Sequence, residues 1–472
     1  MLNLDNSYAR LPGDFYAEVE PDSIASPSML AWNQKLATEI ALDSLGDDTD
    51  QLARIFSGSA ELPGGRPIAM AYSGHQFGYF SPQLGDGRAA LLGEVLTDAD
   101  ERFDIQLKGS GRTPFSRGGD GKSWLGPVIR EYILSEAMHH LGVPTTRALA
   151  AVATGETVYR ESAMPGGILT RVASSHLRVG TFEFFAAKKD VDAVKVLTEY
   201  AIARHFPQVK SGDAPCVAFL RCVAERQAKL VAHWMAVGFV HGVMNTDNTT
   251  ISGETIDYGP AAFLDEFKFR KVFSSIDRQS RYAYINQPSI AQWNLARLAE
   301  AMLLLGDFKS EFEEVLAEFP ANYTNHYLRL MRRKLGLNNE SDGDEDLIRN
   351  WLNFLQEGEL DYTLSFRELA ARADAKDASR FGEFEEQWRR RIGEQETQTG
   401  EVAELMNSVN PLFIPRNHRV EQAIQQAVEG DYSVFEDLNT VMSRPFTEQP
   451  EFIHYADAPE PSERVTRTFC GT

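Results

Sequence analysis

Three polar side chains that lie close together in the sequence could bind a metal ion. Asp247 and Asn248 are adjacent, and Asp257 follows nine residues after Asn248. Carboxylate and amide oxygens are hard ligands of the kind that Mg²⁺ prefers, and a carboxylate can also accept a proton from a reacting hydroxyl. The apolar segment 219–239 precedes them, and residues 249–256 are typical of two short strands around a Ser-Gly turn. This spacing predicts a metal site formed by Asn248 and Asp257.

One side chain expected beside such a site is missing. The segment resembles the catalytic and metal-binding loops of protein-kinase-like folds, in which the catalytic base lies five residues before the metal-binding asparagine. Val243 occupies that position here. The segment therefore keeps the groups that hold a nucleotide and a metal, but it lacks the usual base for transfer of the γ-phosphate to a hydroxyl.

Lys108 and Glu131 are candidates for an ion pair near the phosphates of a bound nucleotide. Residues 103–108 alternate apolar and polar side chains, which predicts a strand with Lys108 on its polar face. Residues 124–141 predict a helix in which Glu131 lies within an apolar stripe. A carboxylate in such a stripe needs a charged partner, and Lys108 is the obvious one. The alternatives are a solvated surface lysine and a glutamate at the edge of the stripe.

Two arginines and two glycine-rich loops could contact phosphate. Arg171 and Arg178 are seven residues apart, so a helix here would place both guanidinium groups on one face. Glycines in the loops 85–88 and 109–123 would let backbone N–H groups approach phosphate oxygens. The alternatives are a pair of surface arginines and ordinary turns.

Composition narrows the class of protein. The 47 Lys and Arg residues against 68 Asp and Glu give a net charge of −21, which disfavours a nucleic-acid partner because phosphate backbones attract basic surfaces. The three cysteines, Cys216, Cys222 and Cys470, are too few for a disulfide scaffold. We see neither an apolar run of membrane-spanning length nor a signal-peptide pattern. We therefore expect a cytoplasmic protein without a membrane partner.

The predicted elements divide the chain into a strand-rich first part and a helical remainder. Strands are predicted at 89–95, 103–108, 149–153 and 156–160, and helices at 28–45, 124–141, 219–239 and 290–305. This order indicates the α+β class, with a strand-rich lobe, a larger helical lobe and a cleft between them. We predict an N-terminal lobe at 1–165, a helical lobe carrying the catalytic and metal loops at 166–400, and a C-terminal helical extension and tail at 401–472.

Several blocks of sequence resemble the selenoprotein O family of pseudokinase-fold protein adenylyltransferases. The matching blocks are 72–78, 82–88, 106–117, 241–248, 257–260 and 410–419. Together they extend over most of the chain. The resemblance implies a protein-kinase-like two-lobed fold with a strand-rich N-lobe and an enlarged helical C-lobe.

The same resemblance implies AMP transfer. ATP would bind in an orientation flipped relative to kinases, and AMP would be attached to Ser, Thr or Tyr hydroxyls of proteins with release of pyrophosphate. The implied cofactor is Mg²⁺, with Mn²⁺ as the alternative. Asp247 is implied as the base, and Asn248 and Asp257 as metal ligands. The residues implied to hold or line the nucleotide are Gly85, Gly87, Arg88, Lys108, Asp120, Gly121, Arg171, Arg178 and Asp257, with Glu131 fixing Lys108.

Two other functions are compatible with these residues, namely a kinase-like phosphotransferase and an inactive nucleotide-binding pseudokinase scaffold. The family resemblance also implies a redox disulfide between a C-terminal cysteine and a cysteine that follows the metal-binding aspartate. Residues 258–288 contain no cysteine, so Cys470 could pair within this chain only with Cys216 or Cys222. That regulatory disulfide is therefore not expected here.

Overall fold

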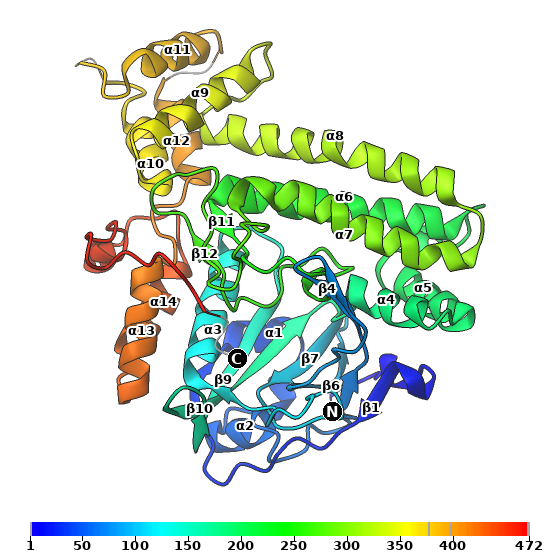
Figure 1. The fold of residues 1–472 in the computed structure, drawn as a ribbon. Helices are drawn as coiled ribbons and strands as arrows, with labels where there is room; N and C mark the ends of the chain where they lie inside the picture. Colours follow the sequence, from blue (N-terminus) through cyan, green and yellow to red (C-terminus); the bar gives the residue numbers. More distant parts are fainter. Residues whose placement is uncertain (1, 376–377, 397–398, 470–472) are drawn as a thin grey trace.

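The computed structural model describes residues 2–375, 378–396 and 399–469. It is an α+β protein with an antiparallel sheet in its first part and helices in its second, as the sequence predicts. Figure 1 shows the helices α4 to α8 on one side of this sheet, with α9 to α12 at the far end of α8. The last described residue before the C-terminus is Phe469, so Cys470 lies outside the described residues.

The main sheet has the strand order β1-β3-β6-β7-β10-β9-β2, with β8 paired to β10. Its strands are β1 (Tyr16–Glu18), β2 (Ser28–Trp32), β3 (Ile68–Met70), β6 (Ala89–Leu96), β7 (Arg102–Lys108), β8 (Ser123–Trp124), β9 (Arg147–Tyr159) and β10 (Ala163–Ala173). The predicted strands at 89–95 and 103–108 are confirmed. The two strands predicted at 149–153 and 156–160 form one strand, β9, which ends at Tyr159, and not a strand pair.

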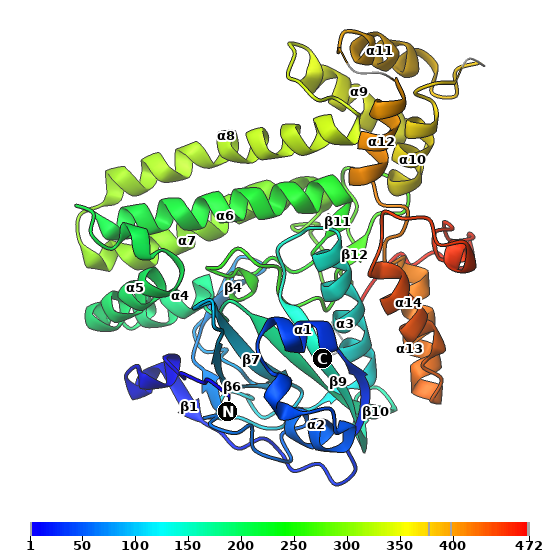
Figure 2. The same cartoon turned by 180° about the vertical axis from the view of Figure 1, so that it is seen from behind.

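The alternation of β7 divides its side chains between two environments. Ile105 and Leu107 are fully buried in an apolar cluster with α1 (Gln34–Glu39) and α2 (Thr49–Phe56). The other face of the strand carries polar side chains that are buried as well and that pair with charged groups of the helices and of β10. This second face positions the candidate site. Figure 2 shows α1 and α2 in front of the sheet in the reverse view.

Twelve α-helices come after strand β8 in the chain. They are α3 (Leu125–His140), α4 (Val179–Ala187), α5 (Val191–His205), α6 (Pro215–Val237), α7 (Gln287–Met302), α8 (Lys309–Lys334), α9 (Asp344–Glu357), α10 (Tyr362–Ala371), α11 (Gly382–Gly393), α12 (Thr399–Val409), α13 (Asn417–Glu429) and α14 (Ser433–Met442). The helices predicted at 124–141, 219–239 and 290–305 correspond to α3, α6 and α7. Helix α6 starts with Pro215 and is followed by Gly238, whose φ of 73° is the usual left-handed helix stop.

Buried apolar side chains connect the two parts of the molecule. The largest cluster joins β3 to α4 through α12, and a second cluster packs α3 against α13 and α14. The boundary predicted at residue 165 falls within β10, and the one at 400 falls within α12, so the division into 1–165, 166–400 and 401–472 stays a prediction. In the described ranges, none of the helices is both long and apolar enough to span a bilayer.

Two further predictions of secondary structure are wrong. The helix at 28–45 is replaced by β2, which pairs with β9, and only residues 34–39 are α-helical, with the Asn33 side chain accepting from Leu36 N–H. The strand pair at 249–256 is also absent, because Thr250 bridges to Arg178 and Thr255 bridges to Thr145. In both places pairing with a distant segment outweighs the local preference.

Candidate active site

A network of buried ion pairs joins β7, α3, β10 and the segment that follows the short strand β11 (Phe239–Val240). Lys108 Nζ lies 2.5 Å from Glu131 Oε2 and 3.0 Å from Asp257 Oδ1. Arg171 contacts the same two carboxylates, through Nε to Glu131 and through a terminal nitrogen to Asp257. The two cations thus bridge the two carboxylates. Asp257 is the most accessible member, with 20% of its side chain exposed against 8% or less for the others.

The charges in this network keep both carboxylates ionised. Burial raises the pKa of each carboxyl, but Arg171 and Lys108 outweigh burial, so the pKa of Glu131 is lowered and that of Asp257 falls well below its ordinary value. Arg178 adds a third cation, with Nη1 3.2 Å from Asp257 Oδ2. Three cations therefore face Glu131 and Asp257, and the buried carboxylate of Asp86 also lies 3.8 Å from Arg178.

Arg178 connects the two loops predicted to hold the metal. It is the residue before α4, and its Nη1 donates to the backbone carbonyl of Asp247 at 2.8 Å while it also contacts Asp257. Its guanidinium lies over the ring of Tyr72, 4.6 Å from the centroid. The helical arrangement considered for Arg171 and Arg178 is wrong, since Arg171 belongs to β10. The two guanidinium groups meet at Asp257 because a strand and a helix start converge there.

The loop 241–248 is held by its own buried groups. His241 Nε2–H donates to the carbonyl of Ile256 at 2.9 Å, and its Nδ1 accepts from the N–H of Val243. Burial lowers the pKa of His241, so the ring is neutral and can make both bonds. Asn248 Nδ2 donates to the Val243 carbonyl at 3.1 Å. Its Oδ1 makes no hydrogen bond within the described residues and can serve as a ligand.

Asp247 has the features of a general base. Its Oδ2 accepts from Gln76 Nε2 at 3.2 Å, whereas its Oδ1 is buried and has no hydrogen-bond partner among the residues that the structure describes. Burial raises the pKa of Asp247 to about 6, although Arg178 opposes this shift. A carboxylate with that pKa is ionised at neutral pH and still basic enough to take a proton. A Cβ at Gly74 would lie 2.5 Å from Asp247 Oδ1, so glycine is required to leave room for it.

The raised pKa of Asp247 predicts how the free energy of unfolding depends on pH. The folded protein holds this proton more tightly than the unfolded chain does, so Asp247 lowers stability as the pH rises from 3.8 to about 6. Asp247→Asn should therefore raise the free energy of unfolding by about 3 kcal/mol above that range, and the gain should vanish below it. Urea unfolding at several pH values measures the difference.

Asp120→Asn is the matched control for that experiment. The side-chain hydrogen bond from Arg160 lowers the pKa of Asp120, so its carboxylate stabilises the fold once it is ionised. This variant should be less stable than the wild type at neutral pH and should match it in acid. An Asp247→Asn protein that is less stable than the wild type at neutral pH would contradict the assigned pKa.

The residues present fit a hard divalent cation. Asn248 offers an unpaired amide oxygen and Asp257 an ionised carboxylate, and both belong to loops joined by Arg178. No set of three or more His, Cys, Asp or Glu side chains with metal-site geometry occurs in the described part of the chain. Mg²⁺ commonly takes only one or two protein ligands and completes its shell with waters and substrate phosphates. The small donor set therefore suits a metal that arrives with a nucleotide.

The two glycine-rich loops pack against each other. A Cβ at Gly85 would lie 2.4 Å from the ring of Phe115, and one at Gly87 would lie 2.8 Å from the Phe115 carbonyl. A Cβ at Gly121 would lie 1.9 Å from the carbonyl of Gly111. Gly85 and Gly121 also have φ values of 70° and 69°, the left-handed region that turns use, so the alternative of ordinary turns stays open and contact of these loops with phosphate stays a prediction.

Arg88 and Asp120 lie outside the ion-pair network. The carbonyl of Arg88 accepts from Gly109 N–H at 2.7 Å, which places Arg88 next to the end of β7, and its guanidinium has no partner among the described residues. Asp120 accepts two hydrogen bonds from Arg160, at 2.9 and 3.0 Å, and its side chain is 45% exposed. Neither residue touches Asp257 within the described chain, so their nucleotide contacts stay a prediction.

Sequence reasoning missed several residues that support this site. Asp86 Oδ2 accepts from Met70 N–H and from Gln106 Nε2, and Asp86 Oδ1 lies 3.8 Å from Arg178. Gln106 could have been found, because it lies two residues before Lys108 on the same face of β7. Gln76 lies in the block 72–78 that resembles the family, but its contact with Asp247 gave no local signal, since it depends on the fold of the distant hairpin of β4 (Gly74–Gln76) and β5 (Tyr79–Ser81).

Comparison with known proteins identifies the family. A family model described as protein adenylyltransferase SelO matches residues 1–443. The chain belongs to this family. It is accordingly a nucleotidyltransferase of the SelO family, and the resemblance seen in the sequence blocks is confirmed.

The curated relatives of this SelO family member match along their whole length. Protein nucleotidyltransferase YdiU of Rhizobium meliloti (strain 1021) is 54% identical over 488 residues, which cover 100% of this chain and 99% of the relative. The protein of the same name from Agrobacterium fabrum is 53% identical and covers 100% of both chains. The one from Bradyrhizobium diazoefficiens is 52% identical over 99% of this chain and 98% of its own.

Proposed function

We propose that this chain transfers AMP from ATP to Ser, Thr or Tyr hydroxyls of proteins and releases pyrophosphate, with Mg²⁺ or alternatively Mn²⁺ as its cofactor. The observation that carries the proposal is the position of Asp247. Its unpaired carboxylate oxygen lies in the loop of Asn248, while Val243 stands where a kinase has its base. Family membership as a protein adenylyltransferase supports the same reaction.

Each part of the transfer has a candidate group. Lys108, Arg171 and Arg178 hold the phosphates, and Arg88 supplies a further guanidinium. Gly85, Gly87, Asp120 and Gly121 line the nucleotide. Asn248 and Asp257 hold the metal, which when bound supplies charge neutralisation of the phosphate oxygens.

The reaction then needs one base and one aligned acceptor. The carboxylate of Asp247 takes the proton of the acceptor hydroxyl as the hydroxyl oxygen forms a bond to the α-phosphorus. The bond between that phosphorus and the oxygen that bridges to the β-phosphate breaks, and pyrophosphate leaves. Fixed charges and alignment supply most of the rate enhancement in such displacements, so a single modest base is sufficient.

The proposal includes the finer structural predictions. We propose that the two parts of the molecule correspond to the lobes of a protein-kinase-like fold, with the domains 1–165, 166–400 and 401–472, and that the protein acts in the cytoplasm. The Lys108–Glu131 ion pair between a strand and the following helix supports this arrangement, because kinase-like folds use such a pair to fix a phosphate-binding lysine.

Mass spectrometry of an acceptor protein tests the proposed function. The purified chain is incubated with ATP, MgCl₂ and a mixture of candidate protein acceptors, and modified peptides are sequenced. The proposal predicts peptides heavier by one AMP group on Ser, Thr or Tyr, and no such adduct without MgCl₂ or MnCl₂. Peptides that carry a phosphate instead would show a phosphotransferase, and the absence of any adduct would favour an inactive scaffold.

A further inference from the structure

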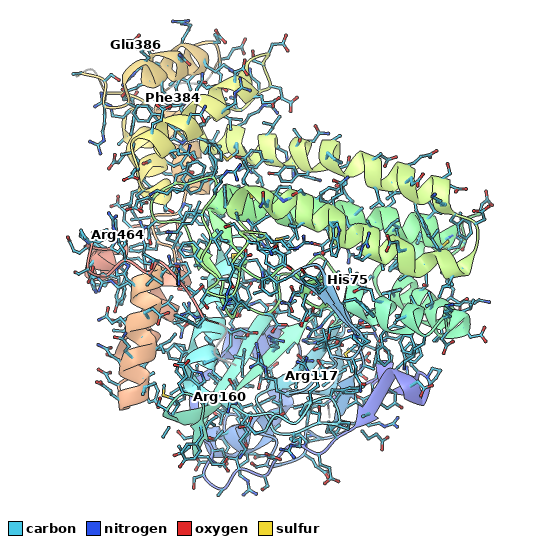
Figure 3. The ribbon with its side chains drawn as sticks, in the orientation of Figure 1. His75, Arg117, Arg160, Phe384, Glu386 and Arg464 are labelled. Atoms are coloured by element: carbon cyan, nitrogen blue, oxygen red, sulfur yellow. The ribbon has the colours of Figure 1, made fainter. Side chains whose placement is uncertain are left out.

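Strand β4 turns its side chains in two directions beside the loop of Asp247. Gln76 Nε2 donates to Asp247 Oδ2 at 3.2 Å. The preceding residue, His75, lies on the opposite face of the strand, where its ring contacts Glu183 of helix α4 and Trp293 of helix α7. Figure 3 shows His75 where the hairpin lies next to the helical part. One face of the strand is thus anchored to two helices, and the other face meets the proposed base.

The hydroxyl of Thr246 joins this anchor to the residue next to the base. Thr246 Oγ1 accepts from His75 N–H at 2.6 Å and contacts Glu183 Oε2. A carboxylate only accepts hydrogen bonds, so the hydroxyl donates its proton to Glu183 and keeps its lone pairs for the N–H of His75. Thr246 and Glu183 are both buried. Loss of the hydroxyl would therefore leave a buried N–H and a buried carboxylate oxygen without this partner, which is costly.

Helix α4 approaches the same loop at two further points. Arg178, which precedes the helix, donates to the Asp247 carbonyl at 2.8 Å. A Cβ at Gly180 would lie 2.1 Å from the Ser73 carbonyl and 3.3 Å from Asp247 Cα, so the start of the helix packs closely against both residues. Glu183 lies one turn further along α4 and bonds the residue before Asp247. The helix, the loop and the hairpin are thus held together at the proposed base.

We infer that Glu183 and Thr246 are positioning residues for AMP transfer, which hold the loop against the hairpin so that the Asp247 carboxylate faces the acceptor hydroxyl. The inference rests on the proposed function, because it assigns a role at that site. Among the described residues, the polar partners of Glu183 and Thr246 are each other and His75, and neither bonds the ion-pair network around Asp257. Both therefore act on the base and not on the phosphate-binding groups.

Two substitutions at residue 246 test the role of the hydroxyl. Thr246→Val keeps the shape of the side chain and removes both of its bonds, whereas Thr246→Ser keeps the hydroxyl. A displacement of about 1 Å at a catalytic group costs about 10²-fold in rate, so we expect Thr246→Val to lower kcat for AMP transfer by that factor with the KM for ATP unchanged. Thr246→Ser should retain most of the wild-type kcat. Initial rates over a range of ATP concentrations, with acceptor protein in excess, measure both constants.

Two substitutions at residue 183 test the partner of that hydroxyl, and they carry the same test if Thr246→Val does not fold. Glu183→Leu removes the acceptor and should lower kcat as Thr246→Val does. Glu183→Gln keeps an oxygen that can accept from Thr246, so it should retain most of the wild-type kcat. Since both residues act through one bond, the double variant Glu183→Leu, Thr246→Val should be no slower than either single variant. Fully additive losses would contradict a shared role.

Thr198→Val is the matched control, because Thr198 is a buried threonine on α5 whose hydroxyl donates to the Val194 carbonyl at 2.7 Å. It makes the same change outside the loop and should keep the wild-type kcat and KM. Equal loss of kcat in Thr198→Val and Thr246→Val, or in Thr246→Ser and Thr246→Val, would overturn the inference. So would a KM for ATP that rises as much as kcat falls, because the effect would then extend to the whole site.

Hydrogen–deuterium exchange separates this inference from the proposed function, because it needs no turnover. In Thr246→Val we expect faster exchange than in the wild type in peptides from residues 72–81 and 241–250, and wild-type exchange there in Thr246→Ser and Thr198→Val. If the wild type transfers AMP to no acceptor but the exchange follows this pattern, the proposed function fails while the positioning contact stands. If AMP is transferred and Thr246→Val keeps the wild-type kcat or the wild-type exchange, the inference fails while the function stands.

Discussion

Asp257→Asn is expected to reduce the rate of AMP transfer about 10³-fold. Asp257 is the point at which Lys108, Arg171 and Arg178 meet, and it is one of two proposed metal ligands. The amide keeps the size of the side chain but removes the charge, so the metal loses its anionic ligand and the three cations lose the group that aligns them. Initial rates with labelled ATP measure the loss.

The control for this variant must separate lost chemistry from lost stability. Breaking a buried ion pair costs about 3–5 kcal/mol, so Asp257→Asn should also unfold at a lower temperature. Asp344 offers the same disruption far from the site, because its buried carboxylate pairs with Arg332 and Arg391. Asp344→Asn should be destabilised in the same way and keep the wild-type rate. Equal rates in Asp257→Asn and the wild type would contradict the metal assignment.

Asp247→Asn should lose about 10²- to 10⁴-fold in rate while it still binds ATP, because only the proton acceptor is removed. The wild-type rate should rise with pH and level off above about 6, where Asp247 is ionised. The residual rate of the variant should lack that rise. Titration calorimetry with ATP and a pH series of initial rates are the measurements.

Retained activity in Asp247→Asn would mean that another group accepts the proton. The variant is useful because it should be more stable than the wild type at neutral pH, so its lost activity could not result from unfolding. A rate profile that rises at a pH far from 6 would also count against Asp247 as the base.

The sequence alone predicts those parts of the site that depend on local periodicity. Alternation in β7 places Lys108 on a polar face, and the apolar stripe of α3 requires a partner for Glu131. The two residues do lie 2.5 Å apart. The sequence also predicts the site at Asp247 and Asn248, because these two polar residues are adjacent in the chain.

The remaining parts depend on contacts between distant segments. Arg171 and Arg178 meet at Asp257 from a strand and a helix start, which no helical spacing could indicate. Thr250 and Thr255 bridge to different segments, so their local hairpin signal was misleading. The hairpin β4–β5 reaches Asp247 from a position 171 residues earlier in the chain, and only the fold shows this contact.

ATP labelled separately at its α- and γ-phosphates tests the central claim most directly. The purified chain is incubated with each labelled ATP, MgCl₂ and the acceptor, and the label is followed on the protein and in the released product. We predict that the label of the α-phosphate appears on the acceptor and that the label of the γ-phosphate appears in pyrophosphate. In Asp257→Asn we expect neither transfer to the acceptor nor release of pyrophosphate. Transfer of the γ-label to the acceptor would contradict the account, because it would mean that the site phosphorylates hydroxyls despite Val243.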